Sequence, residues 1–177
     1  MGTRALIVLR EPDPDLGNVE LAVIYSQWDG YPSGLGRILG EVLGDYEVGN
    51  GIGMKVYTKP FANGIPELAM HLIYELKTRE WEAATNTAKM VNSPSYPIPA
   101  DQFPRQLGHK PGGYYLYPAG TRDAGEEWLY FIEAGENGAV VISVAQAKDG
   151  IPDGNEIWKG PAQKLATKKV YEGLRYD

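Results

Sequence analysis

The N-terminal part of the chain holds two strand-like apolar segments joined by a turn. Residues 3–10 (TRALIVLR) are apolar at both odd and even positions, which is typical of a central strand buried on two faces. Turn-forming residues fill 11–18, and residues 19–26 (VELAVIYS) again have the pattern of a strand. The pattern predicts that these two strands form an antiparallel pair.

Two later segments have apolar residues at helical spacing. Ser33 is placed to cap the first helix, and Pro66 suits the first turn of the second. A spacing of three and four residues puts each set of apolar side chains on one face. The two predicted stripes are Leu35, Ile38, Leu39, Val42 and Leu43, and Leu68, Ala69, Leu72, Ile73 and Leu76.

Glycines at four-residue intervals run along the first predicted helix, at Gly36, Gly40 and Gly44. An interior glycine costs a helix about 1 kcal/mol relative to alanine, so these positions need a reason. Close packing of the helix backbone against the sheet or another helix is the simpler explanation, and access for a ligand is the alternative. Gly44 is also placed to end the helix.

The last third of the chain is rich in strands. The pattern predicts strands at 113–117, 127–133 and 139–147, a short edge strand at 156–159 and a terminal helix over 161–173. A further short strand is expected at 54–57, and the five prolines within 92–112 indicate a long loop. The element order predicts one α+β domain over 1–177, in which two amphipathic helices cover one face of a mainly antiparallel sheet of about five strands.

Composition narrows the chemistry. The chain has 177 residues, no cysteine, two histidines and a formal net charge of −6. These counts exclude disulfides, thiol catalysis and sites that need several histidines, and we expect no metal and no cofactor. An acidic chain disfavours binding to a nucleic acid polymer, and the basic segment 158–177 is more typical of a solvated face. No apolar run is long enough for a bilayer, so we expect a cytoplasmic protein that does not bind membranes.

Four short motifs occur together along the chain. They are MGTR at 1–4, YSQWDGYPSG at 25–34, NGIG at 50–53 and PGGYYLYP at 111–118. In this order they resemble an uncharacterised family of small proteins from bacteria and bacteriophages, over residues 1–53 and 111–133. Ser26 departs from that pattern, since family members usually have arginine there. The resemblance implies a bacterial or bacteriophage source and carries no known activity.

The segment 27–37 is the candidate ligand site, because a strand ends there and a capped helix begins. Helix N-termini bind phosphate or carboxylate through free backbone N–H groups, and aromatic side chains stack on nucleobases. A rigid, packed turn is the alternative explanation for the same residues. Arg4, at the start of the first strand, is expected to pair with Asp29 or Glu20 or to reach the ligand. The predicted site residues are Arg4, Gln27, Trp28, Asp29, Tyr31, Ser33, Gly34 and Arg37.

These observations favour a non-enzymatic protein that binds a small anionic, nucleotide-like ligand at 27–37, with Arg37 and Arg4 as countercharges. In a bacteriophage such a protein would sequester a host defence signal. Two alternatives stay open. The tyrosines at 114, 115 and 117 and the acidic surface suit a protein–protein module, such as an inhibitor of a host factor, and a homo-oligomer is compatible with them. A hydrolase with a carboxylate site at Asp29 is the other, although the sequence has no recognised catalytic motif and no predicted catalytic residue.

Overall fold

Strand β1 (Ala5–Asp13) lies inside a six-stranded sheet. The computed structural model describes residues 2–49, 59–91, 113–148 and 151–174, and of residues 84–91, 148, 151 and 152 it describes the backbone alone. Within this six-stranded sheet, every pair of neighbouring strands is antiparallel except β1 and β6, which run parallel. The strand order is β5 (Tyr114–Tyr117), β2 (Gly17–Ser26), β1, β6 (Trp128–Ala134), β7 (Val140–Lys148) and β8 (Ile151–Pro161).

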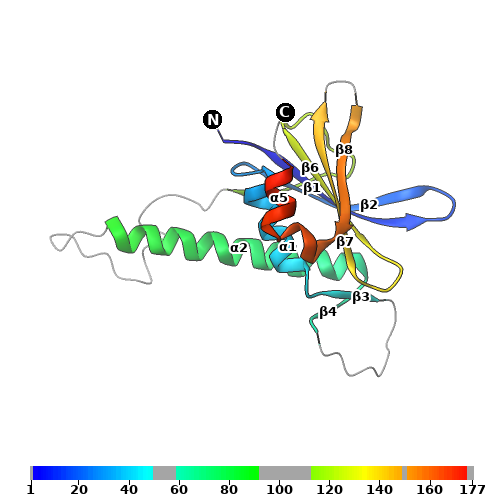
Figure 1. Ribbon diagram of the computed structural model, residues 1–177, viewed down its shortest axis with the longest axis horizontal. Helices are drawn as coiled ribbons and strands as arrows, with labels where there is room; N and C mark the ends of the chain where they lie inside the picture. The colour runs from blue at the N-terminus through cyan, green and yellow to red at the C-terminus, as the bar shows by residue number, and fades with distance from the viewer. Residues whose placement is uncertain (1, 50–58, 92–112, 149–150, 175–177) are drawn as a thin grey trace.

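Helices gather on one face of this sheet, which we call the helix face (Figure 1). The long helix α2 (Gly64–Val91) extends from beneath the sheet well past it, as Figure 1 shows. A second, two-stranded parallel sheet, made of β3 (Glu47–Gly49) and β4 (Phe61–Asn63), precedes α2. The other helices within the described residues are the short π-helical turn η1 (Pro32–Gly36), α1 (Arg37–Leu43), α4 (Ala162–Leu165) and α5 (Lys168–Gly173).

The main core lies between the helices and the sheet, and a smaller one lies on the opposite face, which we call the far face. Ala5, Ile7 and Leu9 point to the helix face, and Leu6 and Val8 to the far face. All five side chains are fully buried, so both alternations of the strand are covered. The prediction of a central strand buried on two faces is therefore confirmed.

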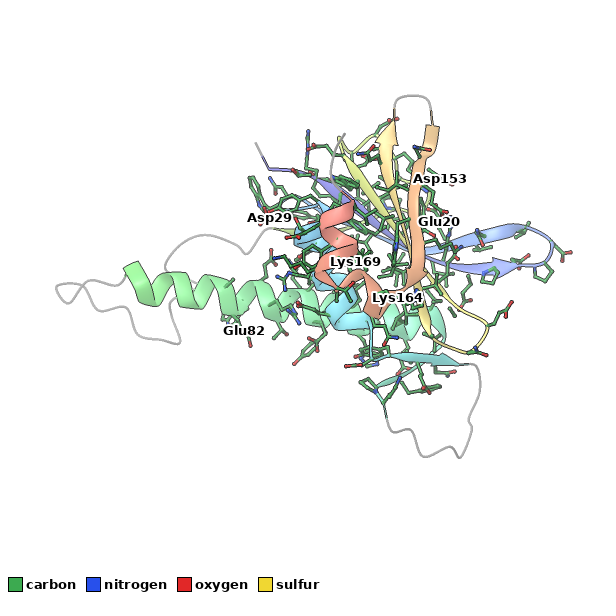
Figure 2. The ribbon with its side chains drawn as sticks, in the orientation of Figure 1. Glu20, Asp29, Glu82, Asp153, Lys164 and Lys169 are labelled. Carbon is green, nitrogen blue, oxygen red and sulfur yellow. The ribbon has the colours of Figure 1, made fainter. Side chains whose placement is uncertain are left out.

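Charged side chains surround the far-face core. The Arg10 guanidinium lies 4.3 Å from the centre of the Phe131 ring and donates to Glu133, which also accepts from Lys159 at 3.2 Å. Arg122 pairs with Glu20 at 2.6 Å and with Asp153 at 2.7 Å, two acids that lie close together in Figure 2. The aliphatic parts of the Arg10 and Arg122 side chains are thus buried, while each guanidinium group has a carboxylate partner. This pairing lowers the free-energy cost of burying the charge.

The α+β class and the mainly antiparallel sheet agree with the sequence prediction, and so does the antiparallel pairing of β1 with β2. Two predictions for the C-terminal part of the chain were wrong. The predicted terminal helix is two helices, α4 and α5, because the Thr167 hydroxyl and N–H both bond the carbonyl of Lys164 and turn the chain. The expected short edge strand is the eleven-residue β8. The strand expected at 54–57 and the proline-rich loop 92–112 lie outside the described residues.

The three spaced glycines, one at the end of η1, one within α1 and one at its C-cap, have the packing role that the simpler explanation required. A Cβ on Gly36 would lie 3.2 Å from the ring of Tyr130, and one on Gly40 would lie 2.5 Å from the backbone nitrogen of Ala166. Gly44, which ends α1, faces Gln163 at 2.9 Å by the same measure. These glycines let α1 approach β6 on one side and the α4–α5 segment on the other.

Replacing Gly40 with alanine tests this packing. Alanine would gain about 1 kcal/mol in helix propensity, but its methyl group would meet backbone that cannot rotate away, at a cost of about 1–3 kcal/mol. We expect Gly40→Ala to lower the free energy of unfolding, measured by urea denaturation. Gly173→Ala is the matched control, because no atom lies within 4 Å of that position and the substitution is expected to be neutral or stabilising. Equal stability of the two variants would contradict the packing role.

Acid titration tests the far-face ion pairs. Burial raises the pKa of Glu133, but the hydrogen bonds and charges of Arg10 and Lys159 outweigh it, so the pKa lies below its usual value. A lowered pKa stabilises the folded state above the carboxyl's normal pKa, and this stability is lost as the pH falls through the folded-state value. We expect Glu133→Gln to be less stable than wild type at pH 7 and the gap to close below pH about 4, measured by urea midpoints. A stability difference between the two proteins that stays constant with pH would contradict this role of the ion pairs.

Candidate functional site

The turn after β2 is held against the start of β1. Asp29 adopts the left-handed conformation, with φ 52°, which is uncommon outside glycine but tolerated by aspartate. The next residue, Gly30, donates its N–H to the Thr3 carbonyl at 2.9 Å and accepts from the Tyr130 hydroxyl at 2.7 Å. A Cβ on Gly30 would lie 2.8 Å from the Cβ of Ala5, so only glycine fits there without a shift. The turn is rigid and packed.

The start of the helix differs from the prediction. The helical segment begins at Pro32, one residue before the expected cap, and Tyr31 occupies the N-cap position without a side-chain cap. The Gly34 N–H donates to the Tyr31 carbonyl at 3.0 Å, and the Leu35 N–H to the Asp29 carbonyl at 2.8 Å. Ser33 therefore does not cap the helix. The expected free N–H groups are largely taken up by the turn itself, which weakens this helix end as an anion site.

Arg37, the predicted countercharge, is engaged along its own helix. Its guanidinium pairs with Glu41 one turn later, and Glu41 also lies 3.4 Å from Arg79 of α2. The other predicted cation, Arg4, is exposed and lies against Gly125. Of its two expected partners, Glu20 pairs with Arg122, and Asp29 accepts from the Tyr31 hydroxyl at 3.3 Å. The two arginines therefore do not converge on the turn.

The predicted site residues separate onto different surfaces. Gln27 lies within 3.5 Å of the Tyr115 hydroxyl, and strand alternation places Arg4 on the far face with Leu6. Trp28 and Asp29 line a cavity on the side of α2, whereas Tyr31 and Ser33 line another on the side of α5. Gly34 packs inside the turn, where a Cβ would meet the Asp29 carbonyl.

The cavity beside α2, which we call the α2 cavity, has a volume of about 340 Å³. Three charged side chains line it: Asp29 from the turn, and Arg79 and Glu80 from α2. Glu80 accepts from the N–H of Gly113 and from Lys77 at 2.7 Å, so its carboxylate is fixed at the cavity wall. The remaining lining residues are Ser26, Trp28, Leu35, Ile38, Leu76, Ala83, Gly113 and Tyr114.

The pKa of Tyr114 reflects the charges that line this cavity. The pKa of Tyr114 is raised to about 12, mainly by burial and in addition by the negative charges of Glu80 and Asp29, against a smaller opposing effect of Arg79. The phenol is therefore neutral at physiological pH and keeps its proton as a hydrogen-bond donor. Aromatic walls, two carboxylates, one guanidinium and one phenol surround the α2 cavity.

The cavity beside α5 has a different character. It has a volume of about 370 Å³, and none of its described lining residues is charged. Hydroxyl groups of Thr3, Ser33 and Tyr171 share the wall with the apolar surface of Trp128 and Leu174. Such a wall lacks the charges that would orient an ionic ligand. We therefore regard the α2 cavity as the better candidate site.

Sequence reasoning missed the contribution of α2 to the site. Arg79 and Glu80 lie about fifty positions after the motif and belong to no motif of their own. Tyr114 carried a signal, since it belongs to the PGGYYLYP motif. Among the residues that the structure describes, no group of three metal-ligating side chains comes together. No helix in the described ranges combines the length and apolarity needed to cross a membrane.

Two substitutions separate the roles of the turn residues. Because Ser33 makes no cap, Ser33→Ala is expected to change the free energy of unfolding by less than about 0.5 kcal/mol, instead of the usual cap loss of about 1 kcal/mol. Tyr130→Phe leaves the buried Gly30 carbonyl without its hydroxyl donor and is expected to cost about 1–2 kcal/mol. Urea denaturation measures both. A larger loss for Ser33→Ala than for Tyr130→Phe would contradict this structure of the turn.

Comparison with known proteins leaves the site to be interpreted from its own chemistry. No protein-family model matches the chain, and neither the curated proteins nor the solved structures compared with it give a match. The arrangement of side chains at the α2 cavity is therefore the basis for a functional assignment.

Proposed function

We propose that this is a non-enzymatic, cytoplasmic binding protein that holds a small nucleotide-like ligand in the α2 cavity. The observation that carries the proposal is the junction of the turn after β2 with α2, where Trp28, Asp29, Arg79, Glu80 and Tyr114 line one cavity of about 340 Å³. Cavities that bind small molecules are commonly 300–1,000 Å³ and combine apolar walls with a few polar groups. The α2 cavity is at the lower end of this range, which suits a mononucleotide.

The aromatic and acidic side chains suit a nucleobase. Trp28 lines the cavity and is 55% exposed, so its side chain has accessible surface on which a base could stack. The carboxylates of Asp29 and Glu80 accept hydrogen bonds from exocyclic amino groups, and the neutral hydroxyl of Tyr114 donates to a ring nitrogen or carbonyl. A base with at least one amino group would satisfy both kinds of partner.

The cation for a phosphate is Arg79 in place of Arg37. Both arginines contact Glu41, but only Arg79 lines the α2 cavity. A guanidinium has five N–H donors in a planar fork, so one contact to Glu41 at 3.4 Å leaves donors for a phosphate. A single cation suits one phosphate group. In a bacteriophage, the setting that the sequence motifs favour, such a protein would sequester a nucleotide signal of host defence.

A matched pair of arginine variants tests the proposal. We expect at least one of AMP, GMP and CMP, whose bases carry an amino group, to raise the melting temperature of the wild type more than its nucleoside does, because only the nucleotide engages Arg79. Arg79→Gln is expected to weaken nucleotide binding about tenfold or more in calorimetric titration, the loss expected for a charged hydrogen bond. Arg37→Gln, which removes the other partner of Glu41, should keep the wild-type affinity.

The stacking role has its own control. Trp28→Ala should abolish nucleotide binding, whereas Trp81→Ala, which removes a tryptophan of similar exposure outside the cavity, should not. A protein whose stability responds to none of the nucleotides, or two arginine variants that behave alike, would refute the proposal. Release of phosphate or base that Asp29→Asn abolishes would replace it with the hydrolase alternative.

A further inference from the structure

The two edges of the sheet are built differently. Strand β8, at one edge, has two irregularities in its register with β7 and carries Asp153, Glu156 and Lys159, features that keep an edge from pairing with another chain. Strand β5, at the other edge of the described sheet, is the regular, uncharged sequence YYLY. Leu116 is 65% exposed and Tyr115 44% exposed. The β5 edge is therefore open to pairing.

The hydrogen bonds of β5 fix which backbone groups point outward. The Gln27 N–H donates to the Gly113 carbonyl at 2.8 Å, and the register pairs Tyr25 with Tyr115. In an antiparallel ladder, bonded residues alternate with residues that face away. The backbone groups of Tyr115 therefore face β2, and those of Tyr114 and Leu116 point out of the edge. This leaves two residues with an N–H and a carbonyl each for another strand.

Both sides of the β5 edge offer apolar surface. On the helix face, a groove of about 370 Å³ separates β5 from α2, lined mostly by apolar side chains that include Ile73, Leu76, Tyr114 and Leu116. On the far face, Tyr117 stacks on Tyr25 with ring centres 5.3 Å apart and planes 3° from parallel. A strand added at this edge would bury side chains on both faces, which is the geometry of strand addition.

We propose that the β5 edge pairs with the β5 edge of a second copy of this chain, antiparallel and about a twofold axis at Tyr115. In this register Tyr114 lies opposite Leu116 of the second copy, so the outward N–H and carbonyl groups of both residues bond in both copies. Leu116 of the second copy then lies over Tyr114, at the groove. The two Tyr115 side chains meet on the far face. This inference does not depend on nucleotide binding.

Charge favours a second copy over a foreign partner. A twofold contact brings each group near its own counterpart, so a charged edge would repel itself, and β5 has no charge. The groove's one charged lining residue, Lys77, is already paired with Glu80 at 2.7 Å. The edge therefore offers little to select a partner of opposite charge. Its exposed surface of leucine and tyrosine is complementary to itself.

The mass in solution tests the contact. By light scattering at micromolar concentrations we expect a particle of twice the 19.4 kDa chain. Leu116→Lys should give the monomer with an unchanged circular dichroism spectrum, because it puts two like charges close to the axis. Leu16→Lys is the matched control: this leucine is 77% exposed, lies outside the edge and should leave the dimer intact. A monomeric wild type, or a dimeric Leu116→Lys, overturns the proposal.

Crosslinking tests the register, because the chain has no cysteine of its own. Opposite residues of an antiparallel pair have Cβ atoms about 4.5–5.5 Å apart, close to the span of a disulfide. Tyr115→Cys should therefore form a covalent dimer on mild oxidation. Tyr117→Cys, on the same face, would be about 14 Å from its counterpart at 3.4 Å per residue and should not crosslink. Equal crosslinking of both variants, or of neither, overturns the proposed pairing.

Discussion

The contact between Gly30 and the start of β1 positions much of the helix face. Two hydrogen bonds, from Gly30 to Thr3 and from Tyr130 to Gly30, hold the turn against the strand that centres the sheet. Because the turn is fixed, η1 and α1 start at one place and in one direction. Gly36 of η1 then allows close contact with β6, and Gly40 of α1 allows close contact with α4. The turn lies between the α2 cavity and the cavity beside α5. Because its backbone is held in place, it does not move into either cavity and fill it.

Fold prediction succeeded where one local pattern had one physical cause. Residues 5–9 are apolar at every position because both faces of β1 are covered, and the glycine spacing of α1 matches real close contacts. Prediction failed for elements whose formation depends on contacts between distant parts of the chain. The strands β3 and β4 have three residues each, too few for a periodic pattern, and their partners lie elsewhere in the chain: β3 pairs with β4 and forms a bridge to Ala139. The break at Thr167 depends on a side-chain bond to Lys164 that competes with the helix.

The candidate site shows the same limit more sharply. The motif at 27–37 was recognisable, but residues that adjoin in sequence point in different directions once the strand ends: Gln27 lies by Tyr115, while Trp28 faces α2. From the sequence, Arg37 was chosen as the cation because it lies close to the motif along the chain. The structure puts Arg79 on the cavity wall instead, brought there by a helix whose core-facing stripe was predicted but whose placement was not. The kinds of side chain at 27–37 can be read from the sequence, but the distant side chains that line a cavity with them cannot.

The two proposals meet in a few shared side chains. Tyr114 and Leu76 line both the α2 cavity and the groove at the β5 edge, so one wall serves both sites. A second copy at the edge would place its leucine over Tyr114, whose hydroxyl we assign to the nucleobase. A group fixed by one partner loses less freedom when the other binds, and linkage requires the effect to be equal in both directions. If both sites are occupied as proposed, ligand binding and dimer formation are therefore coupled, with Tyr114 as the physical connection between them.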